Sequence, residues 1–123
     1  MKSMDKRVLI LVVAAVFLCA ALPQKSVGDY YIVYGNAYTW NSYKQKYLPI
    51  NGVTVELTCS TGVYYDTTHY HAYYGNGFYD FKASEVGRPE WGTVSITYEG
   101  CTYHKSFTED DIPARRDFYL DAC

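Results

Sequence analysis

Two histidines separated by one residue are the first candidates for chemistry in this chain. On a β-strand, His69 and His71 would share one face, and such a pair suits zinc or copper when a third ligand lies nearby. Asp66 and His104 are the available third ligands. Because this spacing specifies a site only loosely, we interpret the three histidines as solvated surface residues and predict no bound metal and no cofactor.

The serine and acidic residues form no recognisable catalytic or calcium-binding motif in the sequence. Ser95 and Ser106 lack the Gly-x-Ser-x-Gly turn that exposes a nucleophile. The run Glu109-Asp110-Asp111 lacks the alternating pattern of a calcium loop, so a solvated acidic loop explains it better. We therefore expect a protein that is not an enzyme.

Tyrosine is the most unusual feature of the composition, with 15 copies in the chain. Aromatic rings with a polar tip make good contact surface for proteins and sugars. The candidate ligand-binding residues lie in a polar loop and in a tyrosine-rich stretch that follows it: Trp40, Tyr43, Tyr47, Tyr64, Tyr65 and Tyr73. We expect this surface to recognise a protein or surface partner, and ordinary packing of the same rings is the alternative.

Two further functions would use these aromatic residues differently. Trp40, Tyr43 and Tyr47 could stack on sugar rings, which would make the domain an extracellular carbohydrate-binding module. The tyrosines could instead be cross-linked, as in a component of a matrix or wall. In every case the expected partner is a protein or glycan at the cell surface or in the matrix.

The N-terminus has the composition of a secretory signal peptide. Basic residues precede an uninterrupted apolar run over residues 8–22, which has the length of a signal core and is short for a membrane span. Cleavage could follow Ala21 or Gly28, and composition favours Gly28. We therefore expect residues 1–28 to be removed and residues 29–123 to form one secreted domain without stable membrane insertion. An uncleaved membrane anchor is the alternative.

Removal of the signal segment would make the protein clearly acidic. The whole chain carries a net charge of −2. Residues 1–28 carry +3, since four basic residues there outnumber one acidic residue, and residues 29–123 therefore carry −5. This balance argues against nucleic acid and anionic membranes as partners, because both are bound through patches of Lys and Arg.

Three cysteines follow residue 28, which is an odd number for an exported protein. We predict a disulfide between Cys101, at the start of one expected strand, and Cys123, at the end of the next. If those strands pair antiparallel, these two ends lie opposite each other, and Cys59 is left as a buried thiol. Pairing of Cys59 with Cys101 or with Cys123 stays open.

Alternation of apolar and polar residues predicts the fold class. After a turn at Asn51-Gly52, apolar side chains at residues 53, 55, 57 and 59 would face one side of a strand, and those of residues 93–99 also alternate. About seven short strands of this kind occur, with no helical periodicity. We expect residues 39–47 to form a loop and residues 63–74 a strand broken near Asp66. The pattern predicts an all-β fold, an antiparallel Greek-key β-sandwich of about seven strands.

The order of these motifs resembles that of the carboxypeptidase regulatory-like, or transthyretin-like (prealbumin-like), β-sandwich. The motifs that carry the resemblance are a glycine-containing first strand, a Pro-x-x-Gly turn with its strand, an Asn-Gly hairpin, a strand ending in a glycine turn and a closing strand: residues 33–37, 48–57, 76–81, 94–100 and 117–120. The resemblance covers nearly all of residues 29–123. It implies a structural or binding module and brings no catalytic residues with it.

Overall fold

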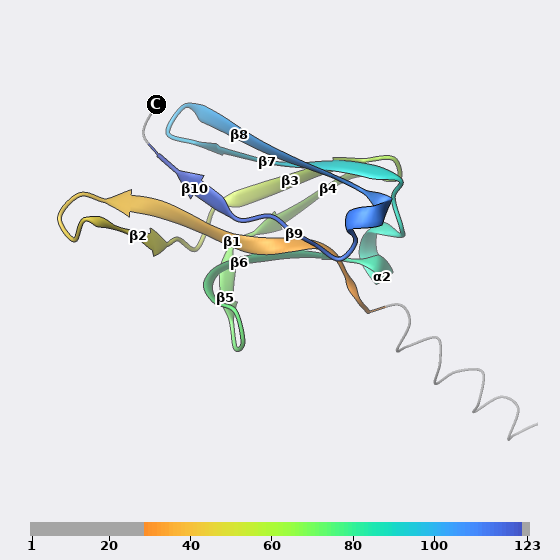
Figure 1. Ribbon diagram of the computed structural model, residues 1–123, viewed down its shortest axis with the longest axis horizontal. Coiled ribbons are helices and arrows are strands. Elements are labelled where there is room, and N and C mark those ends of the chain that lie inside the picture. Colours follow the sequence, from red (N-terminus) through yellow and green to blue (C-terminus); the bar gives the residue numbers. More distant parts are fainter. Residues whose placement is uncertain (1–28, 122–123) are drawn as a thin grey trace, which may run out of the picture. The chain divides into compact units, whose positions relative to one another are not determined.

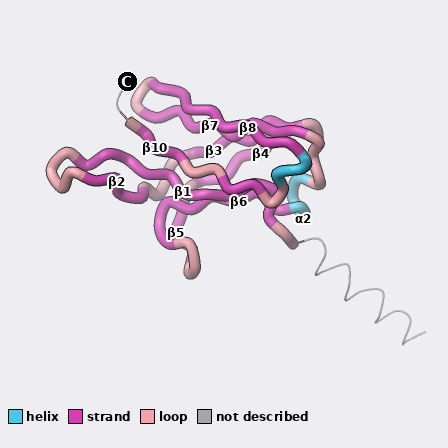
Figure 2. The backbone as a smooth tube through the Cα atoms, viewed as in Figure 1, coloured by secondary structure: helices cyan, strands magenta, loops and turns pink. Residues whose placement is uncertain are grey.

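The computed structural model describes residues 29–121, and most of this chain forms β-strands (Figures 1 and 2). One sheet contains β1 (Tyr31–Asn41), β2 (Lys46–Pro49), β5 (His69–His71), β6 (Gly75–Lys82), β9 (Ala114–Arg115) and β10 (Phe118–Leu120). The other contains β3 (Thr54–Cys59), β4 (Gly62–Thr67), β7 (Trp91–Tyr98) and β8 (Cys101–Thr108). A helical turn, α2 (Ala83–Val86), and a 3-10 turn, η1 (Glu109–Asp111), lie in the connections. The predicted all-β sandwich is confirmed.

The hydrophobic core lies between the two sheets. Alternation in β3 and β7 places Val55, Leu57, Val94 and Ile96 inward, each fully buried. The six-stranded sheet contributes Val33, Ala37, Tyr79, Phe81, Phe118 and Leu120, each at most 2% exposed. Burial of this apolar surface is the main force that holds the sheets together. Tyr98 alternates in phase with Val94 and Ile96 on β7 but is only half-buried.

The long strand β1 organises the six-stranded sheet. Its first half pairs with β9 in parallel and with β6 antiparallel, and its second half pairs with β10 in parallel and with β2 antiparallel. The prediction of a loop over residues 39–47 is therefore wrong, because β1 continues to Asn41 and β2 returns beside it. Trp40 lies opposite Tyr47 in this hairpin, and such aromatic cross-strand pairs stabilise antiparallel strands.

The segment β4–β5 carries the chain from one sheet to the other at Thr68. This side chain is 2% exposed, and its Oγ1 donates to Ile50 O at 2.8 Å and accepts from Val53 N at 2.9 Å. The predicted break near Asp66 is confirmed at this corner. The β5–β6 turn lies between His71 and Gly75, where β6 begins.

The C-terminal strand does not pair as expected. β8 pairs with β7 in the four-stranded sheet, whereas β10 pairs in parallel with β1. The antiparallel pairing from which we predicted the Cys101–Cys123 bond is therefore wrong. Cys59 is a buried free thiol. Because Cys123 lies outside the described residues, its bond to Cys101 stays a prediction.

Residues 1–28, which we predict to be a signal peptide, also lie outside the described residues. Within residues 29–121, no helix has the length and apolar character needed to cross a membrane. Of the described residues, 31–121 belong to one compact unit.

Candidate functional site

The outer face of the six-stranded sheet carries four aromatic rings that come from three strands. Tyr38 and Trp40 are two residues apart on β1, so their side chains share one face of the strand. The buried side chain of Ala37 lies on the opposite face. The register places Tyr119 of β10 beside Tyr38, and Tyr47 of β2 beside Trp40. We call these four residues the aromatic platform.

The rings of the aromatic platform contact one another and remain partly open to water. Tyr38 stacks on Tyr119 with ring centroids 5.2 Å apart and an interplanar angle of 14°. Tyr47 meets Trp40 edge-on at 5.1 Å and Tyr119 edge-on at 5.0 Å. Trp40 and Tyr119 are each 49% exposed, and Tyr47 is 37% exposed. The platform is therefore a preformed contact surface. The conformational entropy of its side chains is lost when the protein folds and not when a partner binds.

A carboxylate fixes the edge of the platform. Tyr47 Oη donates to Asp121 Oδ1 at 2.8 Å and lies 3.1 Å from Oδ2. This hydrogen bond, together with desolvation, raises the pKa of Tyr47 above its ordinary value of 10.0. The phenol therefore stays protonated at neutral pH, and the ring is oriented through its hydroxyl.

A second aromatic group on the same face is covered by the β5–β6 hairpin. Phe78 is fully buried although it points outward from β6. Tyr74 stacks on it at 4.8 Å with an interplanar angle of 3°, and His71 lies 4.6 Å from it between ring centroids. Tyr31 and Tyr34 complete this hairpin cluster. These rings form a small outer core, so we assign them to packing.

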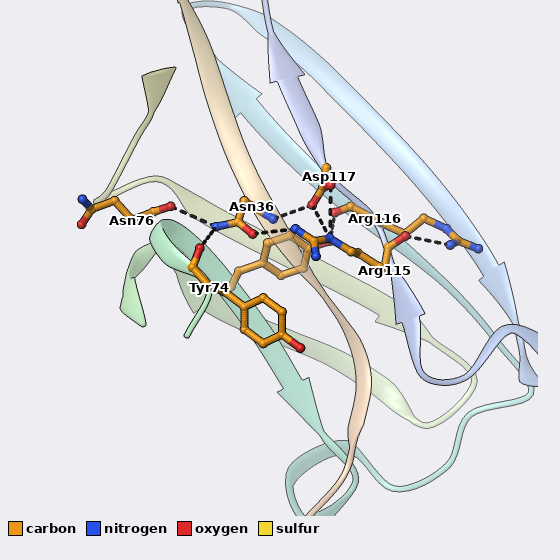
Figure 3. A network of polar contacts seen from close by, with 7 residues as sticks. Asn36, Tyr74, Asn76, Arg115, Arg116 and Asp117 are labelled. Atoms are coloured by element: carbon orange, nitrogen blue, oxygen red, sulfur yellow. Dashed lines mark hydrogen bonds and ion pairs between the residues drawn. The ribbon is translucent and has the colours of Figure 1, made fainter. Parts of the chain in front are cut away.

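A polar network centred on Asn36 lies beside the hairpin cluster on this face of the sheet (Figure 3). Asn36 is 2% exposed, and its Nδ2 donates to Tyr74 O and Asn76 O at 3.0 Å each. Its Oδ1 accepts from Arg115 Nη2 at 3.2 Å, and its backbone N–H donates to Asp117 Oδ1 at 2.8 Å. Asp117 lies in the chain between β9 and β10, and its carboxylate accepts a backbone hydrogen bond from β1 where neither strand pairs with it. The network satisfies every polar group of a buried amide.

Arg115 makes several contacts within this network. Its Nε lies 3.2 Å from Asp117 Oδ2, and its guanidinium lies 5.5 Å from the centroid of the Tyr74 ring and 5.9 Å from that of Tyr34. A guanidinium held over two rings gains cation–π attraction as well as ion pairing. Arg115 therefore fixes the hairpin over the sheet.

The structure brings together only two of the six predicted aromatic residues. Trp40 and Tyr47 belong to the aromatic platform, whereas Tyr43 lies at the β1–β2 turn and is 94% exposed. Tyr73 lies at the β5–β6 turn, 83% exposed and edge-on to Tyr74. Tyr64 and Tyr65 lie on β4, in the other sheet.

Sequence reasoning missed two members of the platform, Tyr38 and Tyr119. Tyr119 is flanked by the apolar residues Phe118 and Leu120, which is a signal that its side chain points outward. The parallel pairing of β1 with β10 joins residues that are far apart in the chain, so no local pattern could have placed Tyr119 beside Tyr38.

The three histidines do not converge. His69 Nδ1 lies 2.8 Å from Thr67 O, and His71 Nδ1 accepts the backbone N–H groups of Tyr73 and Tyr74. His104 lies on β8, in the other sheet. In the part of the chain that the structure describes, no group of three or more His, Cys, Asp and Glu residues could hold a metal ion.

Ser95 and His104 form a contact that sequence reasoning also missed. Ser95 Oγ lies 2.8 Å from His104 Nδ1 across the β7–β8 hairpin. In the strand register Glu56 lies beside Ser95 and not beside His104, so the acid is not placed to orient the imidazole as in a Ser-His-acid triad. We interpret the pair as part of a hydrogen-bonding surface.

No protein-family model matches the chain, and no curated protein sequence matches it significantly. A relationship to transthyretin-like domains therefore stays a proposal that rests on the order of the motifs.

Proposed function

We propose that this protein is a secreted, non-enzymatic binding or structural domain that recognises a protein or surface partner through its aromatic platform. One observation carries the proposal: Trp40, Tyr47 and Tyr119 are held in contact by their strands yet keep 37–49% of their surface exposed. The resemblance to transthyretin-like modules, most of which have structural or binding roles, agrees with this function.

The chemistry of the platform favours a protein partner. Tyrosine and tryptophan are enriched at the centres of protein interfaces, where a few such residues carry most of the binding energy. The rings lie on strands and are held in place by contacts with one another and with Asp121. Binding of a partner would therefore not require these side chains to become ordered. A rigid surface of this kind binds with a smaller entropic cost than a mobile loop.

The decisive experiment compares two tryptophans of equal exposure. Trp40 is 49% exposed within the platform, and Trp91 is 50% exposed at the start of β7. Immobilised protein with the unchanged sequence, Trp40→Ala or Trp91→Ala would be incubated with the secretion medium, and each captured partner would be purified for calorimetry. We expect Trp40→Ala to weaken partner binding about thirtyfold and Trp91→Ala to leave it unchanged. Equal binding by both variants would overturn the proposal.

Carbohydrate binding at the same platform is the second candidate. Trp40 and Tyr47 present rings beside the Asp121 carboxylate, and rings next to a hydrogen-bond acceptor suit a sugar. A glycan array probed with the unchanged protein and with Trp40→Ala separates the candidates. Hits that disappear in Trp40→Ala would favour a carbohydrate-binding module over a protein-binding one.

Export and processing can be tested directly. The protein recovered from the secretion medium should begin at Asp29, or at Leu22 if cleavage follows Ala21. N-terminal sequencing decides between these sites, and a protein that keeps residues 1–28 in the membrane fraction would show an uncleaved anchor.

A further inference from the structure

The outer face of the four-stranded sheet forms a second candidate site, a groove of about 520 Å³. Threonines of β3, β7 and β8 line it, together with Glu56, Tyr65, Ser95 and His104. The two sheets form the two layers of the sandwich (Figure 1), and the inner face of each is buried in the core. The groove and the aromatic platform therefore lie on opposite outer faces.

The strand register aligns four different side chains across the groove. Tyr65 of β4 pairs with Glu56 of β3, Glu56 pairs with Ser95 of β7, and Ser95 pairs with His104 of β8. Neighbouring strands lie about 4.8 Å apart, so this row spans roughly 14 Å. A ring, a carboxylate, a hydroxyl and an imidazole therefore follow one another over the length of a short oligosaccharide.

Cross-strand hydrogen bonds hold the polar side chains of the groove in place. Thr93 Oγ1 lies 3.0 Å from Ser106 Oγ, and Thr97 Oγ1 lies 3.0 Å from Thr102 Oγ1. With Ser95 and His104 they form three successive polar pairs along β7 and β8. Each hydroxyl both donates and accepts, so hydrogen-bonding capacity remains for a ligand after the pairs have formed.

Charge narrows the class of ligand. Neither lysine nor arginine lines the groove, and Glu56 is its one carboxylate. Phosphates, sulfates and other anions would therefore meet repulsion and no cation. Tyr65 is 66% exposed at one end of the row and presents its ring to solvent. A neutral, hydroxyl-rich ligand with apolar ring faces matches all of these groups.

We propose that this groove binds a neutral oligosaccharide. Tyr65 stacks on one sugar ring, Glu56 accepts hydrogen bonds from hydroxyls of the next, and the polar pairs of β7 and β8 exchange hydrogen bonds with the remainder. The proposal does not depend on the aromatic platform, since the two sites share no residue.

The test uses the secreted protein and a panel of cello-, malto-, xylo-, manno- and chito-oligosaccharides, with a heparin oligosaccharide as the anionic probe. Calorimetry and amide NMR shifts would measure binding. We expect at least one neutral oligosaccharide to bind with a Kd on the order of 0.1 mM, as is reasonable for a shallow polar site. The shifted amides should lie on β3, β4, β7 and β8.

A matched pair of tyrosine variants locates the site. Tyr65→Ala should weaken oligosaccharide binding about tenfold, whereas Tyr70→Ala, at a side chain 63% exposed on β5, should leave it unchanged. Glu56→Gln should also weaken it, because a neutral amide is a poorer acceptor than a carboxylate.

The proposal would be overturned by no binding of any neutral oligosaccharide, by binding of the heparin oligosaccharide alone, by equal loss in both tyrosine variants, or by shifts confined to the six-stranded sheet. Loss of binding in Trp40→Ala with full binding in Tyr65→Ala would move the sugar site to the aromatic platform, which would also overturn it.

Discussion

The two outer faces of the sandwich follow the same alternation of side chains and yet become different surfaces. On the four-stranded sheet the outward positions hold mainly short hydroxyls, and the face stays open as a polar groove. On the six-stranded sheet the outward positions of β1 hold rings, and the β5–β6 hairpin folds over part of them. Phe78 and Asn36 are buried on that face as completely as core residues.

This difference shows how side-chain size changes the requirements of a sheet face. Large rings on the outer face of a sheet offer apolar surface on which another segment, here the β5–β6 hairpin, can pack. That segment buries polar groups, which then need hydrogen-bond partners within the protein. Asn36, Arg115 and Asp117 meet that requirement on the six-stranded sheet. On the four-stranded sheet water can supply these hydrogen bonds, so the polar groups there are available to a ligand.

Gly35→Ala should have the largest effect of the variants considered. A Cβ at Gly35 would collide with the backbone carbonyl of Arg116, in the segment that joins β9 to β10 and runs beside β1. Backbone cannot yield as a flexible side chain does, so we expect a loss of about 3 to 4 kcal/mol in the free energy of unfolding, or failure to fold. Urea denaturation followed by circular dichroism would measure it.

Gly100→Ala is the control for that variant. Gly100 has a φ of 83° at the β7–β8 turn, and nothing lies within 4 Å of its added Cβ. Only the cost of a left-handed backbone applies, about 1 kcal/mol. A similar loss in both variants would show that the segment beside β1 is less tightly packed than the structure indicates.

The predicted Cys101–Cys123 disulfide would tie the two sheets together at one end. Cys101 begins β8, and Tyr103 Oη donates to Asp121 O near the end of β10, so the chain before Cys123 already lies against β8. We expect one free thiol in the secreted protein, at Cys59, and a loss of about 3 kcal/mol on Cys101→Ser. Thiol titration and mapping of disulfide-linked peptides would measure these. A peptide linking Cys59 to either other cysteine would contradict the pairing.

Removing one polar side chain from each face tests the comparison directly. Asn36→Ala leaves the backbone carbonyls of Tyr74 and Asn76 without their donor inside a covered layer, so we expect a loss of about 2 kcal/mol. Thr93→Ala on the open face should cost less than about 0.5 kcal/mol, because water replaces the lost partner of Ser106. Chemical denaturation of both variants measures the difference, and equal losses would show that the faces do not differ in this way.

Sequence reasoning succeeded where one face of a strand is polar and the other apolar. The alternation from Val53 to Cys59 predicts which side chains of β3 are buried, and the structure confirms it. β1 instead has aromatic or apolar residues on both faces, from Tyr31 to Trp40, because one face meets the core and part of the other meets the hairpin. Local alternation could not separate these faces, nor show that β1 runs on to Asn41.

The candidate sites depend on strand order, which the sequence does not display. Trp40 and Tyr47 were predictable as neighbours, since they belong to one short hairpin. Tyr119 joins them through a parallel pairing between the two ends of the described chain. The row from Tyr65 to His104 likewise requires the β4-β3-β7-β8 order, in which β3 and β7 are far apart in sequence.

Asp80→Asn should stabilise the protein slightly, by an amount that depends on pH. Burial raises the pKa of Asp80 above its ordinary value of 3.8, and the nearby Asp66 carboxylate adds to the shift. A raised pKa means that the folded state binds the proton more tightly than the unfolded state. The stability this supplies is complete below pH 3.8 and is lost as the pH rises through the folded-state pKa.

The asparagine variant removes that loss, because its side chain has no charge to desolvate or to repel Asp66. Asp80 is about half-buried, so solvent screening limits the gain at pH 7 to less than about 1 kcal/mol. At pH 3 the two proteins should unfold at nearly the same urea concentration. If Asp80→Asn were no more stable than the unchanged protein at pH 7, partial burial beside Asp66 would not penalise the Asp80 charge.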